Sequence, residues 1–253
     1  MTTVYDIYSF IEDIAPYRLQ EDYDNSGLNV GEMSAEVRSV LVALDCTAEV
    51  AREACQRDFD LVLTHHPVIF RGLKTLVLND PAVILAAGGK NALSMHTNFD
   101  SAEGGMNDVL CKMLGLKPES ALHEEHGVGC GYVCKCDGMN VRELAQRAKD
   151  VLGCRVVRFS GGEREIRRVG VCSGSGGSFL ADAAEKGCQV LLTGDVKHDV
   201  FIDGENMGVS VIDAGHFYTE NIFCEFIANE LKNKFSGLRV EIAVSNRDIV
   251  EVI

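Results

Sequence analysis

The chain of 253 residues has no tryptophan, only four prolines and no long apolar run. No stretch approaches the ~18 uninterrupted apolar residues that a membrane helix requires. The first residues lack the basic and apolar regions of a secretory signal. The ten cysteines are scattered and include no C-x-x-C pair, so we expect reduced thiols rather than a disulfide framework. These absences predict a soluble cytoplasmic protein with no membrane association.

Positive charge is also scarce. The chain has 24 lysines and arginines against 38 acidic residues, which gives a formal net charge of −14. Affinity for nucleic acid comes mainly from lysine and arginine displacing counterions, and no basic stripe is present, so a nucleic-acid partner is not expected. The hydrophobic content of 46% is typical of a globular protein, and the length suffices for a substantial core.

The first part of the chain has the pattern of an α/β protein. Apolar residues at helical spacing predict a helix over residues 3–14. Residues 40–44 read as a buried strand, Thr47 as the cap of a helix over 48–57, and residues 61–64 as a second strand. A strand, a helix and a strand within ~30 residues predict a βαβ unit of a parallel sheet.

A similar unit recurs later in the chain. A shift of 129 positions places Val40 on Val169, Leu63 on Leu192 and Thr64 on Thr193 without a gap. Either a duplication or a merely shared βαβ pattern explains this match. We predict a single α/β unit with mainly parallel sheets, built from two related halves at about 1–122 and 123–253.

Histidines follow several of the predicted strands. The strand at 61–64 stops on a histidine pair, and the strands at 92–95 and 209–213 are each followed by a histidine with an acid four residues later. In open α/β sheets, ligands bind beyond the carboxyl ends of the strands. These residues can therefore converge on one edge of the sheet. The candidates are His65, His66, His96, Asp100, His216 and Glu220.

This set of side chains is typical of a metal site. A catalytic zinc takes about three protein ligands, so six candidates suit two ions, with Asp100 or Glu220 as the bridge. Imidazole and carboxylate ligands suit zinc, iron and manganese alike. The alternative is that these are ordinary histidines at strand ends.

Two loops have two possible roles each. The acidic stretch 21–28 reads as a surface turn or as a polar loop that lines a site. The glycine-rich stretch 172–178 reads as a flexible turn or as a loop whose backbone amides bind a phosphate.

One cysteine-rich stretch could be mistaken for a second metal site. It contains His126, Cys130, Cys134 and Cys136. We interpret these cysteines as one face of an alternating strand, together with Tyr132. His123 and His126 are expected to be exposed to solvent.

Five motifs together resemble the Nif-three-like family of dinuclear-metal proteins, whose members are often described as GTP cyclohydrolase I type 2 homologues. The motifs are Tyr23-Asp24-Asn25-Ser26-Gly27-Leu28, Leu63-Thr64-His65-His66-Pro67, His96-Thr97-Asn98-Phe99-Asp100, Leu192-Thr193-Gly194-Asp195 and Asp213-Ala214-Gly215-His216-Phe217-Tyr218-Thr219-Glu220. The resemblance implies a Nif-three-like fold, two metal ions per subunit and a homohexameric ring with the sites facing its interior. It implies metal ligands at His65, His66, Asp100, His216 and Glu220, with His96 beside or on the metals.

The chain departs from the family pattern in two motifs. Tyr23 stands where the family usually has tryptophan, and His198 lies one residue before the family's usual His-Asp position. The short connection around Leu122 leaves no room for the domain that some relatives insert between the halves.

The function that this resemblance implies is metal-dependent hydrolysis of a small, nucleotide-like substrate. Water activated by the paired cations would open a purine ring, with His96 or His198 carrying the proton. One alternative is a phosphatase or phosphodiesterase that uses the same site. Another is a metal-binding hexamer that acts in interactions and has no turnover.

Overall fold

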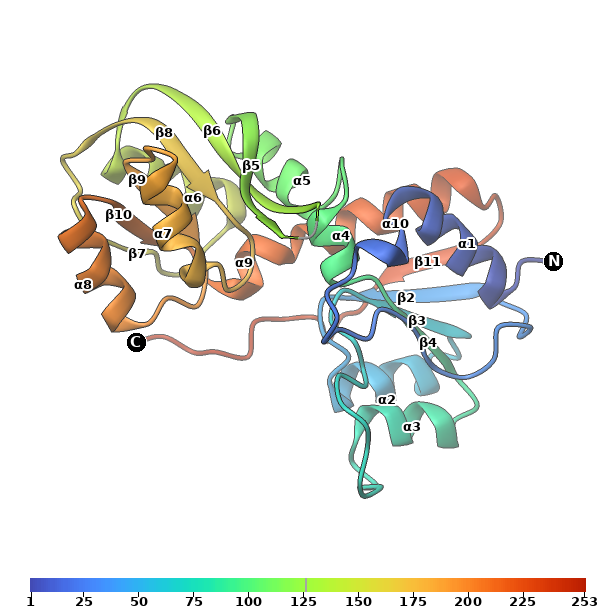
Figure 1. Cartoon of the computed structure of the whole chain (residues 1–253). Coiled ribbons are helices and arrows are strands. Elements are labelled where there is room, and N and C mark those ends of the chain that lie inside the picture. The colour runs from blue at the N-terminus through green and yellow to red at the C-terminus, as the bar shows by residue number, and fades with distance from the viewer. Residues whose placement is uncertain (126) are drawn as a thin grey trace. The chain divides into compact units, whose positions relative to one another are not determined.

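The computed structural model describes residues 1–125 and 127–253, so the expectation for His126 lies outside the described residues (Figure 1). The chain forms two compact units. Unit 1 comprises Met1–Ala102 and Phe223–Ile249, and unit 2 comprises Glu103–Ile222 and Val250–Ile253. Residue 122, where the two predicted halves meet, lies inside a strand of unit 2. The C-terminal strand pairs with the first sheet, so that part of the chain belongs to unit 1. The two related halves at about 1–122 and 123–253 stay a prediction.

Unit 1 contains a five-stranded sheet in the order β1-β4-β3-β2-β11. The strands are β1 (Gly27–Val30), β2 (Ser39–Ala43), β3 (Leu61–Thr64), β4 (Asn91–Ser94) and β11 (Arg239–Ile242). Neighbours from β4 to β11 run parallel, and β1 adds an antiparallel edge. Every residue of β2, β3 and β4 is buried, which explains their nearly continuous apolar sequences.

Three helices of unit 1 begin at polar caps that are visible in the sequence. The helices of this unit are α1 (Val4–Ile14), the 3-10 turn η1 (Tyr17–Leu19), α2 (Ala48–Gln56), α3 (Pro81–Ala87), α4 (Thr97–Ser101) and α10 (Ile222–Lys234), which belongs to this unit from Phe223 onward. Thr3 and Asp6 form a capping box at α1, and the Thr47 side chain accepts a hydrogen bond from the Val50 amide at α2. The predicted helices at 3–14 and 48–57 are therefore confirmed.

Unit 2 contains a six-stranded sheet in the order β5-β6-β8-β9-β10-β7. Its strands are β5 (Lys117–Glu125), β6 (Val128–Asn140), β7 (Arg158–Phe159), β8 (Glu165–Val171), β9 (Val190–Thr193) and β10 (Ser210–Asp213). Its helices are α5 (Met106–Met113), α6 (Val141–Leu152), η2 (Gly177–Phe179), α7 (Leu180–Glu185), α8 (His198–Met207) and α9 (His216–Glu220). Strands β8, β9 and β10 run parallel, whereas β5, β6 and β7 pair antiparallel. Both sheets are thus mixed.

The two sheets repeat one arrangement of strands. In unit 1, Val40 is opposite Leu61, and in unit 2, Val169 is opposite Val190. A shift of 129 positions relates both residues of the first pair to those of the second. The order β1-β4-β3-β2 recurs as β7-β10-β9-β8, with the outer strand antiparallel in both. The predicted repeat of the βαβ unit is therefore confirmed at the level of strand register.

One expectation about β6 is wrong. Cys134 and Cys136 are buried on one face, but Cys130 packs with the cluster on the opposite face, which contains Val133. Gly131 lies between them with φ of 66°, outside the strand region, so the alternation of side chains breaks there.

Within the described part of the chain, no helix has the length and apolarity needed to cross a bilayer.

Candidate metal centre

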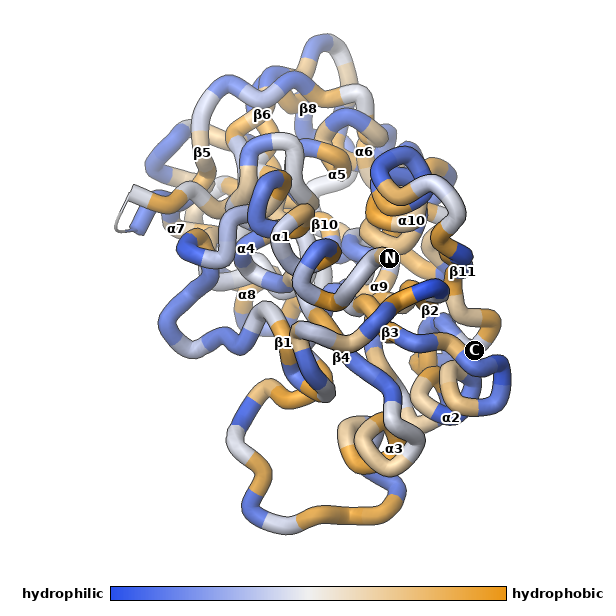
Figure 2. Tube along the Cα trace, turned by 90° about the vertical axis from the view of Figure 1, so that its right-hand side faces the viewer, coloured by the Kyte–Doolittle hydropathy of each residue, from blue (hydrophilic) through white to orange (hydrophobic). Residues whose placement is uncertain are grey.

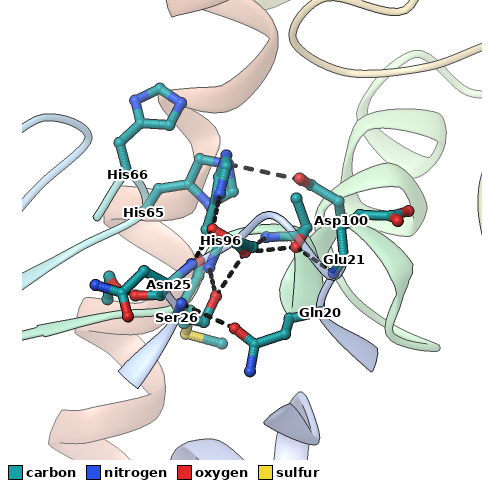
Figure 3. Close-up of polar contacts among 12 residues, drawn as sticks. Gln20, Glu21, Asn25, Ser26, His65, His66, His96 and Asp100 are labelled. Atoms are coloured by element: carbon teal, nitrogen blue, oxygen red, sulfur yellow. Dashed lines mark hydrogen bonds and ion pairs between the residues drawn. The ribbon is translucent and has the colours of Figure 1, made fainter. Parts of the chain in front are cut away.

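Three histidines of unit 1 gather at the carboxyl ends of two neighbouring parallel strands. His65 and His66 directly follow β3, and His96 follows β4 after one residue. Their ring centroids are 4.9 Å apart for His65 and His66, 5.2 Å for His65 and His96, and 5.3 Å for His66 and His96. One nitrogen from each ring lies within 4.8 Å of the others (Figure 3). The predicted convergence of these three residues is a direct result of the strand register.

A carboxylate completes this group. Asp100 lies on α4, the helix that His96 precedes, and its Oδ1 is 3.6 Å from Nε2 of His65 (Figure 3). His65 is fully buried, and its ring packs against Phe223 with centroids 5.4 Å apart. A buried imidazole beside a carboxylate is an arrangement in which a cation would neutralise the charge.

The hydrogen bonds of the imidazoles decide which nitrogen is available to a ligand. Nδ1 of His65 lies 2.9 Å from the Met95 carbonyl oxygen, and Nδ1 of His66 lies 2.7 Å from Oδ1 of Asp45. A carbonyl or an ionised carboxylate only accepts hydrogen bonds, so Nδ1 must carry the proton in both rings. The lone pair of each neutral ring is then on Nε2, which is the usual arrangement of metal-binding histidines.

His96 is oriented in the same way by a buried carboxylate. Its Nδ1 lies 2.7 Å from Oδ1 of Asp24, which also accepts hydrogen bonds from Ser26 Oγ at 3.0 Å and from the Thr97 amide at 3.1 Å. Burial alone would raise the pKa of Asp24, but the hydrogen bonds from His96 and Thr97 outweigh burial and hold this pKa well below its ordinary value. Asp24 is therefore ionised at neutral pH. The acidic loop at 21–28 is thus a loop that lines the site and not a simple surface turn.

Unit 2 carries a second histidine–carboxylate pair. His216 and Glu220 begin and end α9, and Nε2 of His216 lies 2.8 Å from Oε2 of Glu220. Nδ1 of His216 lies 2.9 Å from Oδ2 of Asp195, which follows β9. Glu220 is buried. This pair repeats the pattern of unit 1 in that an acid at one strand end orients the imidazole through Nδ1, while Nε2 faces the Glu220 carboxylate.

Gly174 makes room for Glu220. Its φ is 59°, and a Cβ atom built on it would lie 2.1 Å from Oε1 of Glu220 and 3.3 Å from Nε2 of His216. The Gly174 amide donates to Oγ1 of Thr219 at 3.0 Å, which fixes the loop against α9. The shift of 129 positions places Gly174 on Asp45. The position that supplies the Asp45 carboxylate in unit 1 is therefore occupied in unit 2 by Gly174, which has no side chain.

Several backbone amides of the glycine-rich stretch 172–178 already have hydrogen-bond acceptors within unit 2. The amide of Ser173 donates to Oδ1 of Asn107 at 2.9 Å, and the amide of Gly176 donates to Oγ1 of Thr193 at 2.7 Å. Together with the amide of Gly174, three amides of the stretch therefore donate within unit 2. The stretch also positions backbone beside Glu220.

The structure does not group every predicted histidine with these clusters. His198 is exposed at the first position of α8, and no potential metal-binding cluster found among residues 1–125 and 127–253 includes it. Its catalytic role stays a prediction. His123 is half-buried rather than exposed, because its ring stacks on Phe179 at 4.8 Å and its Nδ1 lies 2.9 Å from Asp182.

Sequence reasoning missed Asp45 and Asp195 as partners of the histidines. Each follows a buried strand closely, which is the same signal that identified His65 and His96. The sequence pattern indicated Asp24 only as part of a loop that could line a site, and not as the partner of His96. Whether the four residues of unit 1 and the pair of unit 2 bind the same cations stays a prediction.

The fold and these clusters define a class: an α/β protein with a repeated βαβ unit and histidine–carboxylate groups suited to divalent cations at the strand ends. The sequence profile described as Duf34/NIF3 (NGG1p interacting factor 3) matches residues 2–249. The chain belongs to this NIF3 family.

Related proteins match this chain over most of their length. The chain is 37% identical over 225 residues to the GTP cyclohydrolase 1 type 2 homologue of Clostridium perfringens, covering 85% of this chain and 86% of that protein. It is 33% identical over 248 residues to the GTP cyclohydrolase 1 type 2 of Helicobacter pylori strain 26695, covering 94% and 95%. The crystal structure of a hypothetical protein of Staphylococcus aureus superposes with a TM-score of 0.90 at 28% identity over 99% of both chains.

Proposed function

We propose that this protein is a dinuclear-metal-dependent hydrolase that opens the ring of a purine nucleotide. The ligands would be His65, His66, Asp100, His216 and Glu220, with His96 beside the metals. The observation that carries the proposal is that Nδ1 of each imidazole lies against a carbonyl or carboxylate oxygen, which is how metal-binding histidines are oriented to present Nε2 to a cation.

The donor set fits a pair of divalent cations. Imidazole nitrogens and carboxylate oxygens together suit zinc, iron or manganese. The repeat supplies such donors twice, at equivalent strand ends of the two sheets. Since one catalytic ion takes about three protein ligands, the two sets together match two ions. Bound there, the cations would supply a Lewis acid for the substrate and lower the pKa of water.

His96 is the residue of the chain best placed to move a proton. The ionised Asp24 holds the proton on Nδ1, so Nε2 of His96 can accept a proton from water and pass it to the leaving group. His198 is the second candidate, and its exposed position at the start of α8 would suit exchange with solvent. Replacing His96 and His198 in turn would show which of the two imidazoles carries the proton.

The names of the relatives support this activity. The Helicobacter pylori relative is described as a GTP cyclohydrolase 1 type 2, and the Clostridium perfringens relative as its homologue. The family name, NGG1p interacting factor 3, supports the alternative of a metal-binding protein that acts through interactions. We also propose a homohexameric ring, which light scattering would test by its mass.

The test combines metal content with product release. The purified protein is analysed for metal per chain and then incubated with GTP, with formate reporting ring opening and phosphate reporting ester hydrolysis. His66→Ala removes a proposed ligand. His123→Ala is the matched control, because His123 lies outside the clusters and bonds to Asp182.

The outcomes separate the alternatives. Formate release that His66→Ala abolishes and His123→Ala leaves unchanged supports the hydrolase. Phosphate release without formate, with the same response to the variants, would replace ring opening by phosphatase activity. Two metals per chain with no product from a broad panel of nucleotides would leave a binding protein.

A further inference from the structure

Two large aromatic side chains are exposed to solvent beside the histidine cluster of unit 1. Tyr23 is 66% exposed and Phe70 is 41% exposed. Their ring centroids are 6.2 Å apart at an interplanar angle of 55°, and the Phe70 centroid is 6.0 Å from that of His96. Neither ring contributes much to the core, since most of its surface stays in water.

The loops that carry these rings are tied together. The Asn25 side chain donates from Nδ2 to the Ile69 carbonyl oxygen at 2.6 Å, and the Val68 amide donates to Oδ1 of Asn29 at 2.8 Å. Each bond joins the neighbourhood of Tyr23 to the residues just before Phe70. The spacing of the two rings is therefore held by hydrogen bonds and does not depend on burial.

The electrostatic character of this region differs from that of the rest of the chain. Residues 61–79 contain Arg71 and Lys74 and no acidic residue, although the whole chain has a net charge of −14. Residues 70–79 are all exposed. Figure 2 shows several apolar segments along this long loop before α3. An anionic ligand would therefore meet two cationic side chains and no acidic side chain along this loop.

We propose that Tyr23 and Phe70 bind the flat face of a heteroaromatic ring that carries anionic groups, and hold it beside His96. A ring of this kind stacks on aromatic faces, and the basic residues after Phe70 favour its phosphate. This inference rests on the proposed function and assigns its substrate-positioning residues. It does not require Tyr23 or Phe70 to touch the metals.

The absence of tryptophan from the sequence provides a direct probe. Tyr23→Trp introduces a single tryptophan at the proposed stacking site and keeps an aromatic face there. Tyr5→Trp is the matched control, because Tyr5 is 60% exposed on α1 and is also in unit 1. Zinc-loaded protein is titrated with GMP and, separately, with ribose 5-phosphate, which has the phosphate but no ring.

We expect GMP to quench the fluorescence of the Tyr23→Trp variant in a saturable way and to leave the Tyr5→Trp variant unchanged. Ribose 5-phosphate should not quench either variant. Adding Phe70→Ala to Tyr23→Trp should weaken GMP binding about tenfold, the lower part of the range for one base stacked on one ring. Zinc content should be unchanged in all variants, which separates lost stacking from a damaged metal site.

Equal quenching in both tryptophan variants, or no quenching by GMP, would overturn the inference. Its failure is distinguishable from that of the proposed function. GMP binding that depends on Phe70, without formate release from GTP, refutes the hydrolase and keeps the stacking site. If the protein releases formate from GTP and neither Tyr23→Ala nor Phe70→Ala changes the KM for GTP, the hydrolase is supported and the stacking site is refuted.

Discussion

Replacing Asp45 should weaken metal binding without unfolding the protein. Asp45 contacts the cluster through His66, whose Nδ1 lies 2.7 Å from Asp45 Oδ1. Its side chain is 51% exposed, so Asp45→Ala leaves no buried group behind. We therefore expect a change in the free energy of unfolding of the metal-free protein within about 0.5 kcal/mol.

The effect on metal affinity follows from the role of that hydrogen bond. A carboxylate on Nδ1 fixes the ring and raises the basicity of Nε2, and removing such a partner lowers metal affinity about 10–100-fold. Because half of the Asp45 side chain faces solvent, its electrostatic contribution is screened, and we expect the lower end of this range, about tenfold or roughly 1.4 kcal/mol. Competition with a chromogenic zinc chelator measures the affinity directly.

The control for this experiment is Glu49→Ala. Glu49 lies in the first turn of α2, is 59% exposed and pairs with Arg247 at 3.2 Å, so its loss changes the net charge equally without touching a histidine. An equal loss of zinc affinity in both variants would show a general charge effect. No loss in Asp45→Ala would refute the reasoning that Asp45 prepares His66 for a metal.

Three further predictions concern stability. Gly174→Ala should lower the free energy of unfolding measured in urea by about 1–3 kcal/mol more than Gly153→Ala. Both glycines have positive φ, but only at Gly174 would a Cβ atom meet Glu220. Equal losses of stability in the two variants would contradict this. Burial raises the pKa of Glu53, but hydrogen bonds from Ser245 outweigh it and lower this pKa to about 2. At pH values above 4.5, its ordinary pKa, Glu53 therefore contributes up to about 3 kcal/mol to the free energy of unfolding. This contribution is lost as the pH falls toward 2. In urea titrations from about pH 6 to about pH 3, the free energy of unfolding should fall less steeply with decreasing pH in Glu53→Gln than in the wild type. An equal dependence on pH in both proteins would contradict this. Zinc at 100 times its Kd should raise the free energy of unfolding by about 2.7 kcal/mol, and a chelator should reverse the gain; no shift would exclude a native-state site.

The comparison of the two units shows how a repeat can diverge in function. At equivalent positions, unit 1 has Asp45 and His66, whereas unit 2 has Gly174 and Asp195. In unit 1 the acid at the first position orients the imidazole at the second. In unit 2 the acid at the second position orients His216, and the glycine leaves space for Glu220. Equivalent strand ends of the two units thus orient their imidazoles through acids at different positions.

Much of this organisation could be predicted from the chain alone. Apolar strands that end on polar residues, such as Leu61–Thr64 before His65, are strongly patterned because both faces of a parallel strand are buried. The repeat at 129 positions followed from the same patterning, and the strand register agrees with it. The convergence of His65 and His96 required only the rule that parallel neighbours end at one edge of a sheet.

Other features depended on tertiary structure. The partners of the imidazoles lie 21 residues away for Asp45 and 72 residues away for Asp24, and no local pattern specifies which carboxylate meets which ring. The antiparallel strands of unit 2 and the change of face at Gly131 also depend on long-range pairing. Sequence by itself determined which residues stand at the strand ends, because burial imposes a repeating pattern on the chain. Only the folded structure decided which imidazole nitrogen faces a ligand, because that choice follows from hydrogen bonds between residues that are distant in sequence.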